Sequence, residues 1–244
     1  MKSAAKKRID QLIVERGLAD SRQKAQALIL AGEVMVNGQR AEKAGQTVAA
    51  DSQVSIGQAA EFVGRGGLKM RAAIEQFHID VKGKVCIDVG SSTGGFTDCL
   101  LQNGAARVHA VDVGTNQLDW KLRSDPRVVV HEQLNARYLK PEDIGELCEI
   151  AVCDVSFISV SLILPVLPPL LRDNAEMVIL VKPQFEVGRE DVGKGGIVRD
   201  SELHMAVCRK IEAAVRQLGF ETEIIDSPIL GAEGNREFLL HASH

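Results

Sequence analysis

The chain of 244 residues lacks an apolar run long enough to cross a membrane. Its most apolar stretch, Ile158–Leu171, is shorter than the roughly 20 residues that a membrane helix needs, and three prolines interrupt it. The first residues, Met1–Arg8, are basic and lead into an amphipathic pattern, so they do not have the form of a secretory signal. We therefore expect a cytoplasmic protein without a membrane span.

Patterns of disulfide and metal sites are also missing. The five cysteines are odd in number and form no C-x-x-C pair, which excludes a disulfide framework and the usual zinc sites. Cys86, Cys153 and Cys208 lie in apolar runs and are expected to be reduced core residues. The six histidines show no metal-ligand spacing, so no metal site is expected.

Two nucleotide-binding fingerprints are absent as well. The glycine-rich segment Asp88–Asp98 reads D-x-G-x-x-x-G-G and does not contain the G-x-G-x-x-G of dinucleotide sites. Phe96 stands where a loop that cradles phosphates would carry a lysine. Both pyrophosphate-binding interpretations are therefore disfavoured.

The same segment does have the features of a nucleoside-cofactor site. It follows an apolar run typical of a buried parallel strand, and its glycines permit tight turns close to a ligand. A second acid, Asp112, ends the next apolar run, where a carboxylate can accept ribose hydroxyls. S-adenosylmethionine fits this pattern; a glycine turn that serves only tight packing is the alternative. The candidate cofactor contacts are Asp88, Gly90, Ser91, Ser92, Thr93, Gly94, Gly95, Phe96, Asp112 and Asn135.

Charge divides the chain into two parts. Residues 1–75 carry a net charge of +4 and the remainder −8, which gives −4 in total. A basic amino-terminal part on an acidic body suggests that the first part meets a polyanion, although most basic clusters are only solvated faces. We expect two domains, residues 1–60 and residues 61–244, joined by a linker at Gly57–Ala60.

The first part predicts a small α+β domain. A helix begins near Ile9 and is closed by Gly17, and Ser21 is a suitable cap for a second helix that ends before Gly32. Asn37-Gly38 is a strong signal for a hairpin turn. Val48 and the run at 54–56 supply further short strands.

The second part alternates strands and helices, which predicts an α/β doubly wound, Rossmann-like sheet. A helix near Leu68–Phe77 opens it. Further helices are expected at Phe96–Asn103, Leu139–Leu147, Ile158–Leu171 and Ser201–Gly219. Seven strands are expected, the last two as a hairpin-like pair, at Val85–Val89, Arg107–Val111, Val128–His131, Ile150–Cys153, Met177–Val181, Glu221–Asp226 and Phe238–His241.

The motifs of the first part resemble the S4 RNA-binding domain. They are Arg8-Ile-Asp-x-x-Leu12, Arg16-Gly-Leu18, Ser21-Arg22 and Val34-x-Val-Asn-Gly38. The resemblance implies that basic residues of the helix pair contact RNA phosphates, which position a protein without reading sequence. It places Arg8, Arg16, Arg22 and Lys24 in this role. A protein–protein module with a solvated basic face is the alternative.

Four ionisable residues are candidates for catalysis. Asp154 and Lys182 end two predicted strands, Lys69 begins the helix after the linker, and Glu237 precedes the last strand. A lysine at the end of an apolar strand is costly unless it is paired, and Asp154 is a natural partner. A ribose hydroxyl is a poor acid, so its methylation needs a proton acceptor and positive charge. We expect Lys182 to be the base or alkoxide stabiliser, Lys69 a second cation, and the two acids to orient the lysines.

Other methyl-transfer chemistries fit less well. Methylation of base amino groups uses an Asn/Asp-Pro-Pro-aromatic run, where this chain has Asp154-Val-Ser-Phe157. Methylation of cytosine carbon 5 needs a nucleophilic cysteine, but Cys153 lies inside an apolar strand and is expected to be a packing residue.

Lys69, Asp154, Lys182 and Glu237 resemble the K-D-K-E tetrad of FtsJ-like ribose 2′-O-methyltransferases. Together with the first part, the chain resembles the TlyA, or hemolysin A, family almost end to end. That resemblance implies S-adenosylmethionine-dependent 2′-O-methylation of cytidine in 16S and/or 23S rRNA within ribosomal subunits. One departure is Gly64, where a serine is usual before Arg65-Gly-Gly; we interpret it as affecting linker flexibility.

Several weaker candidates accompany these. Arg65 belongs to the Arg-Gly-Gly-Leu-Lys motif, and Lys194 and Arg199 lie in a glycine-rich loop that either clamps RNA phosphates or is simply solvated. Phe157 either stacks on a base or belongs to the core. Two other function classes stay open: a cytolysin, and a ribosome-binding protein without catalytic activity.

Overall fold

The computed structural model describes residues 6–37, 39–41, 43–57, 61–231 and 234–244. It separates into two compact units, Met1–Glu61 and Phe62–His244. The first unit has one hydrophobic core and the second unit has two. Gly38 of the predicted hairpin turn and residues 58–60 of the predicted linker lie outside the described residues.

The first unit is a small α+β fold. Its second helix is capped as predicted, because Ser21 Oγ accepts a hydrogen bond from Lys24 N at 3.2 Å. A strand at residues 6–8, which we did not predict, pairs antiparallel with the strand at 47–49. The elements are β1 (Lys6–Arg8), α1 (Ile9–Glu15), α2 (Arg22–Leu30), β2 (Val34–Val36), β3 (Gln39–Arg40), β4 (Thr47–Ala49) and β5 (Val54–Ile56).

The two helices of this unit pack on each other through apolar side chains at helical spacing. Ile9, Ile13 and Ile29 are at most 2% exposed. Val34 and Val48 from the strands close the same cluster. Arg22 and Lys24 of α2 are left at the surface, whereas Asp10 of α1 is buried.

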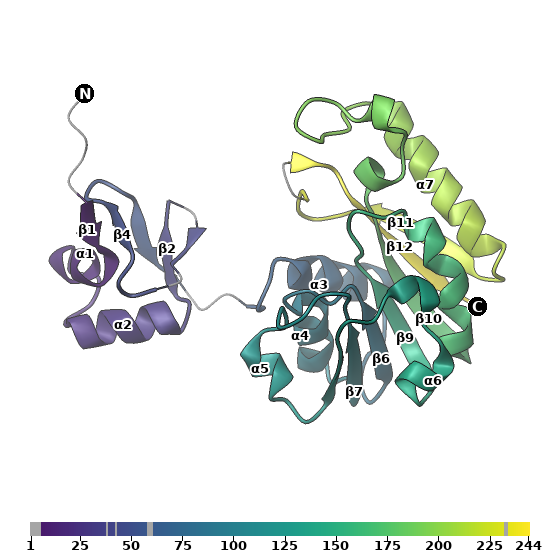
Figure 1. The fold of residues 1–244 in the computed structure, drawn as a ribbon, viewed down its shortest axis with the longest axis horizontal. Coiled ribbons are helices and arrows are strands. Elements are labelled where there is room, and N and C mark those ends of the chain that lie inside the picture. Colours follow the sequence, from purple (N-terminus) through teal and green to yellow (C-terminus); the bar gives the residue numbers. More distant parts are fainter. Residues whose placement is uncertain (1–5, 38, 42, 58–60, 232–233) are drawn as a thin grey trace. The chain divides into compact units, whose positions relative to one another are not determined.

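The second unit contains the predicted seven-stranded sheet, in the order β11-β12-β10-β9-β6-β7-β8 (Figure 1). Five neighbouring strands, from β10 to β8 in this order, pair in parallel, whereas β12 runs antiparallel to both β10 and β11. The doubly wound α/β prediction is confirmed. The strands are β6 (Val85–Val89), β7 (Arg107–Val111), β8 (Val128–His131), β9 (Cys148–Cys153), β10 (Leu171–Val181), β11 (Glu221–Asp226) and β12 (Phe238–Ser243).

Helices cover both faces of this sheet, with α3, α4 and α5 on one face and α6 and α7 on the other (Figure 1). Alternate residues of each strand therefore enter two separate cores. In β7, Val108 and Ala110 pack in the core beneath α3, α4 and α5, whereas Val111 packs in the core beneath α6 and α7. The helices are α3 (Gly66–Phe77), α4 (Gly95–Gln102), α5 (Trp120–Arg123), α6 (Pro141–Ile144) and α7 (Ser201–Arg216).

The predicted helix at Ile158–Leu171 is wrong. Three short 3₁₀ helices replace it, at Val160–Leu162, Leu164–Val166 and Pro168–Leu170. Prolines lack the N–H that an α-helix needs, and consecutive prolines prevent its continuation. Val160, Ile163, Leu164, Leu167 and Leu170 of this run are buried, whereas Leu162 is 46% exposed, and β10 begins at Leu171.

Candidate active site

The carboxyl ends of β6, β7, β9 and β10 meet at one edge of the sheet, where three adjoining cavities open. Their volumes are about 240, 490 and 410 Å³. Ser156, directly after β9, lines all three. We call them the loop cavity, the nucleoside cavity and the acceptor cavity. A ligand at the switch point of a doubly wound sheet occupies this edge.

Asp88, the last residue but one of β6, lines the loop cavity and is fully buried. Its Oδ2 accepts hydrogen bonds from Thr97 N at 3.0 Å and Thr97 Oγ1 at 2.6 Å. Its Oδ1 has no partner among the described residues. Burial raises the pKa of Asp88 to about 7, and the nearby Asp154 carboxylate adds to this rise. The site thus holds one buried carboxyl oxygen, Asp88 Oδ1, that lacks a donor or cation among the described residues.

Two glycines of the loop are required by its close packing. Gly90 has φ of +86°, and a Cβ there would lie 2.6 Å from the backbone oxygen of Asp154. Gly94 has φ of +95°, and a Cβ there would lie 2.2 Å from the Leu122 side chain. Both positions combine a left-handed backbone with no room for a side chain.

The start of α3 packs directly on this glycine loop. Asp98 of α4, 2% exposed, accepts a hydrogen bond from Val63 N at 2.9 Å. A Cβ at Gly64 would lie 2.7 Å from Thr93 Oγ1, and one at Gly95 would lie 2.9 Å from Gly67 N. Gly64 therefore contacts the loop, so our interpretation of it as a matter of linker flexibility is wrong.

The nucleoside cavity is lined by Asp112 and Asn135, as the cofactor prediction requires. The carboxylate of Asp112 accepts hydrogen bonds from Ser92 N at 2.8 Å and Gly114 N at 2.7 Å, which fix its orientation. The side-chain oxygen of Asn135 accepts from Arg137 N at 3.0 Å. The cavity wall also contains apolar side chains, among them Leu134 and Ile163.

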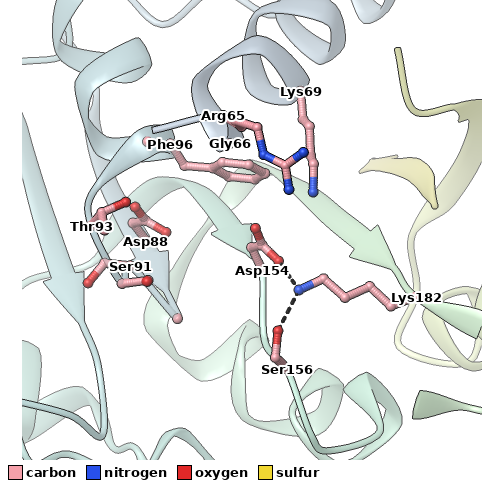
Figure 2. Close-up of a pocket in the computed structure, with 13 residues that line it drawn as sticks. Arg65, Gly66, Lys69, Asp88, Ser91, Thr93, Phe96, Asp154, Ser156 and Lys182 are labelled. Atoms are coloured by element: carbon pink, nitrogen blue, oxygen red, sulfur yellow. Dashed lines mark hydrogen bonds and ion pairs between the residues drawn. The ribbon is translucent and has the colours of Figure 1, made fainter. Parts of the chain in front are cut away.

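Lys182 and Asp154 meet at the junction of the three cavities (Figure 2). Their Nζ and Oδ1 atoms are 2.5 Å apart, and Lys182 Nζ also donates to Ser156 Oγ at 2.8 Å. The lysine is 8% exposed. A buried ammonium group is stable only with such partners.

Lys69 and Glu237 form a second buried ion pair on the other side of this junction. Lys69 Nζ lies 2.5 Å from Glu237 Oε2, and the two residues are 7% and 4% exposed. Gly231 makes room for the acid, because a Cβ there would lie 2.0 Å from Glu237 Oε1. The structure thus brings together all four residues of the predicted tetrad as two ion pairs.

The acceptor cavity extends from these two lysines. Lys69, Lys182 and Glu237 line its floor, and Phe185, Val192 and Asn235 lie around it. Phe157 also lines it, 92% exposed with φ of +65°, and its ring lies 5.4 Å from that of Phe185. The alternative that Phe157 belongs to the core is therefore wrong.

The basic residues predicted to contact RNA have different surroundings. Arg8 and Arg22 both donate to buried Asp10 at 2.9 Å, while Lys24 is exposed. Arg16 donates to the backbone oxygens of Ser52 and Ala50, at 2.6 and 2.7 Å. In the second unit, Arg65 projects towards the loop cavity beside Lys69 (Figure 2), and Lys194 and Arg199 are exposed.

Cys153 is fully buried, and burial raises the pKa of its thiol to about 12. It is a packing residue, as predicted, because a neutral buried thiol is a poor nucleophile. Among the described residues, no cluster of three potential metal ligands occurs. No helix within those residues is long and apolar enough to span a bilayer.

Sequence reasoning assigned no role to Ser156, Gly231, Asn235 or Asp98. Ser156 and Asn235 each stand two residues from a tetrad acid. Alternation along an extended segment places such residues on the same side as the acid. Gly231 carried no signal, because its role depends on the Glu237 side chain folding back onto it.

Family models match both units. The FtsJ-like methyltransferase model matches residues 62–244, and the S4 domain model matches residues 7–54. The 16S/23S rRNA (cytidine-2′-O)-methyltransferase TlyA of Mycobacterium tuberculosis is 45% identical over 240 residues, which cover 97% of this chain and 90% of the relative. Hemolysin A of Brachyspira hyodysenteriae is 43% identical over 236 residues, covering 96% and 98% respectively.

A solved structure is also similar to this chain over both units. It is of a protein from Streptococcus thermophilus named as a hemolysin, and it superimposes with a TM-score of 0.76 at 46% identity, covering 98% of this chain and 88% of that one. Similarity at this level extends across both units and includes the tetrad-bearing domain. The chain is therefore a methyltransferase of the TlyA, or hemolysin A, family, in which an S4 domain precedes an FtsJ-like domain.

Proposed function

We propose that this enzyme transfers a methyl group from S-adenosylmethionine to the 2′-hydroxyl of a cytidine in 16S and/or 23S rRNA within ribosomal subunits, in the cytoplasm. The observation that carries the proposal is the pair of buried lysines, Lys69 and Lys182, at the floor of a cavity that adjoins the nucleoside cavity. We take the proposed substrate, cytidine in 16S and 23S rRNA, from the name of the M. tuberculosis relative.

The cavities fit S-adenosylmethionine at both of its ends. Asp88 offers an unpartnered buried carboxylate oxygen, which suits an ammonium group. Asp112 and Asn135 line the larger cavity, where ribose hydroxyls and an adenine need polar partners. When bound, the cofactor supplies a methyl group already activated by the sulfonium. The remaining proposed loop contacts that line the loop cavity are Gly90, Ser91, Ser92, Thr93, Gly95 and Phe96. Gly94 stands among them, but a Cβ there would meet Leu122 and Leu118, so its role is in the packing of the loop.

The two ion pairs then act on the acceptor hydroxyl. Lys182, held by Asp154 and Ser156, stabilises the developing alkoxide as an ammonium group, or accepts the hydroxyl proton at Nζ once it has given up its own proton to solvent. Lys69 presents a second positive charge to the same oxygen, and Glu237 fixes its position. Both charges are already oriented, so little reorganisation is needed during transfer.

We propose RNA contacts on each of the two units. Arg65, Lys194 and Arg199 lie at or near the cavities of the second unit, and exposed Phe157 is suited to stacking on a base. In the first unit, Arg8, Arg22 and Lys24 present cations at the surface, and Arg16 adds a guanidinium group that also ties the loop at Ala50–Ser52.

The test is transfer of a labelled methyl group to separate small and large ribosomal subunits, followed by mapping of the modified nucleotide. We expect incorporation at a cytidine ribose, resistant to alkaline cleavage on its 3′ side. Incorporation into a base, or none into either subunit, would overturn the proposal. A parallel lysis assay with erythrocytes and the K182A variant tests the cytolysin alternative, which lysis by that variant would support.

A further inference from the structure

The glycine-rich segment Asp191–Asp200 forms one wall of the acceptor cavity, through Val192 and Gly196. The segment turns tightly: Gly193 N donates to Ile197 O at 3.1 Å, and Gly195 and Gly196 have φ of +81° and +76°. A loop of this kind has little intrinsic rigidity, because glycine loses more conformational freedom on ordering than any other residue. It therefore depends on outside anchors to hold one conformation.

Asn235 is one such anchor. It is 3% exposed and lies two residues before Glu237 of the tetrad. Its side-chain oxygen accepts a hydrogen bond from Val198 N at 3.1 Å, and its side-chain nitrogen donates to Gly196 O at 2.9 Å. The backbone oxygen of Asn235 accepts from Gly231 N at 2.9 Å, which links the same residue to the glycine beneath Glu237.

His204 of α7 is the second anchor. Its Nε2 lies 3.0 Å from the backbone oxygen of Val198, and only the donor role of that nitrogen satisfies a carbonyl. The ring is 3% exposed and packs edge-on against Phe238. Both backbone groups of Val198 are thus held by buried side chains, the N–H by Asn235 and the carbonyl by His204.

The two cations of the loop lie beside these anchors. Lys194 and Arg199 are exposed, and the Arg199 guanidinium lies 3.7 Å from where a Cβ of Gly193 would be. Because Gly196 and Val198 are fixed, the backbone that carries both cations is fixed relative to Glu237. A charge that is held in place loses less entropy on binding a phosphate than one on a free loop.

We propose that Asn235, assisted by His204, is a positioning residue for the RNA acceptor: it holds the loop at 191–200 as a preformed phosphate-binding wall of the acceptor cavity. The proposal rests on the proposed RNA methyl transfer and assigns its polyanion contact to this loop. Asn235 acts through Lys194 and Arg199, so its removal weakens RNA binding rather than cofactor binding.

The test compares kinetics of the full-length chain and its variants on the ribosomal subunit that accepts the methyl group. For Asn235→Ala we expect KM for RNA to rise ~10-fold, as for one lost orienting interaction, with the Kd for S-adenosylmethionine unchanged. The Lys194→Ala/Arg199→Ala variant should show a similar rise. Adding Asn235→Ala to it should have little further effect, because both changes remove the same contact.

Limited trypsin digestion reports the loop independently of activity. Cleavage after Lys194 and Arg199 should accelerate in Asn235→Ala and in His204→Ala, but not in His204→Gln, whose amide can still donate to Val198 O. The His204 pair also replaces Asn235→Ala if that variant does not fold.

Unchanged KM and unchanged cleavage in these variants would overturn the inference, as would fully additive effects in the combined variant or a loss confined to kcat. If the wild-type chain transfers no methyl group to either subunit, the proposed function fails instead. In that case the digestion still decides whether Asn235 and His204 hold the loop.

Discussion

Lys182 Nζ lies 2.5 Å from Asp154 Oδ1, at the point where two neighbouring parallel strands end. The pair is 28 residues apart in sequence but joined by the register of β9 and β10, in which Ile179 lies opposite Cys153. An ion pair at this position is expensive to bury and adds little net stability. We therefore attribute it to chemistry at the junction of the three cavities.

Replacement of Lys182 by alanine should abolish methyl transfer without loss of the cofactor. A general base or alkoxide stabiliser typically contributes ~10²–10⁴-fold to a rate, so kcat should fall by that amount. The Asp88 and Asp112 regions that we assign to the cofactor are not altered, so the Kd for S-adenosylmethionine should stay the same. Single-turnover kinetics and calorimetry measure the two effects; full activity in K182A would refute the assignment.

Gly231→Ala should disturb the acid of the second ion pair. A Cβ at Gly231 would lie 2.0 Å from Glu237 Oε1, so the carboxylate must move. This movement would disrupt the ion pair between Glu237 and Lys69. The Glu237 side chain can rotate away, so we expect lower kcat with only a small change in thermal stability. Gly57→Ala is the matched control, because a Cβ there meets nothing within 4 Å. Equal activity of both variants would argue against a role for the Glu237 position.

Much of the site could be predicted from the sequence, because several of its residues stand at the ends of apolar runs. Asp88, Asp112, Asp154 and Lys182 each follow an apolar run, and the parallel topology carries them to one edge. Strand recognition was therefore enough to bring them together. Lys69 and Glu237 lie outside the parallel strands. The sequence offered them as candidates, but strand positions gave no reason to expect them at the same edge, and the family resemblance grouped them with the others as a tetrad.

Two predictions, the helix at Ile158–Leu171 and the interpretation of Gly64, failed for identifiable reasons. In Ile158–Leu171, apolar spacing favoured a helix, but Pro165, Pro168 and Pro169 remove the donors that an α-helix requires. Gly64 was misinterpreted because its neighbour, Thr93, is distant in sequence. Contacts between loops depend on the exact path of the backbone, which hydrophobic periodicity does not report.

Cofactor affinity should depend on pH through Asp88. Burial raises the pKa of this carboxyl to about 7, so it is partly protonated at neutral pH and becomes an anion above it. An anion binds an ammonium group better, so affinity for S-adenosylmethionine should rise as pH increases through 7. Asp88→Asn should bind more weakly and lose this component of the pH dependence. Calorimetric titration of both proteins between pH 6 and 8 checks it, and parallel pH curves would contradict it.

The same raised pKa has a consequence for folding. The folded state binds the Asp88 proton more tightly than the unfolded state, whose carboxyl has an ordinary pKa. The contribution of Asp88 to stability is therefore greatest at low pH and declines as pH rises from about 4 towards 7. Asp88→Asn should remove this decline, and urea unfolding at several pH values measures the difference.

Asp10 should govern both the stability and the RNA affinity of the first unit. This buried carboxylate accepts from Arg8, Arg22 and Gln26, and the Arg8 hydrogen bonds, with Arg22, hold its pKa well below the usual range. Such a group stabilises the fold above the unfolded pKa, and this stabilisation is lost as pH falls through the lower folded value. Asp10→Asn should mimic the loss at neutral pH, because a neutral amide cannot hold two guanidinium groups.

For this variant we expect faster hydrogen exchange in α1 and α2 of the full-length chain and no change in the β6–β10 region, because the two units have separate cores. RNA affinity should fall, and the dependence of log Kd on log salt should become shallower if Arg8 or Arg22 no longer meets a phosphate. Lys24→Ala is the control, since this exposed lysine makes no contact with Asp10 among the bonds of the described residues. It should reduce the salt dependence without changing hydrogen exchange. If Asp10→Asn accelerates exchange but leaves RNA affinity and its salt dependence intact, the two arginines serve only to stabilise the unit.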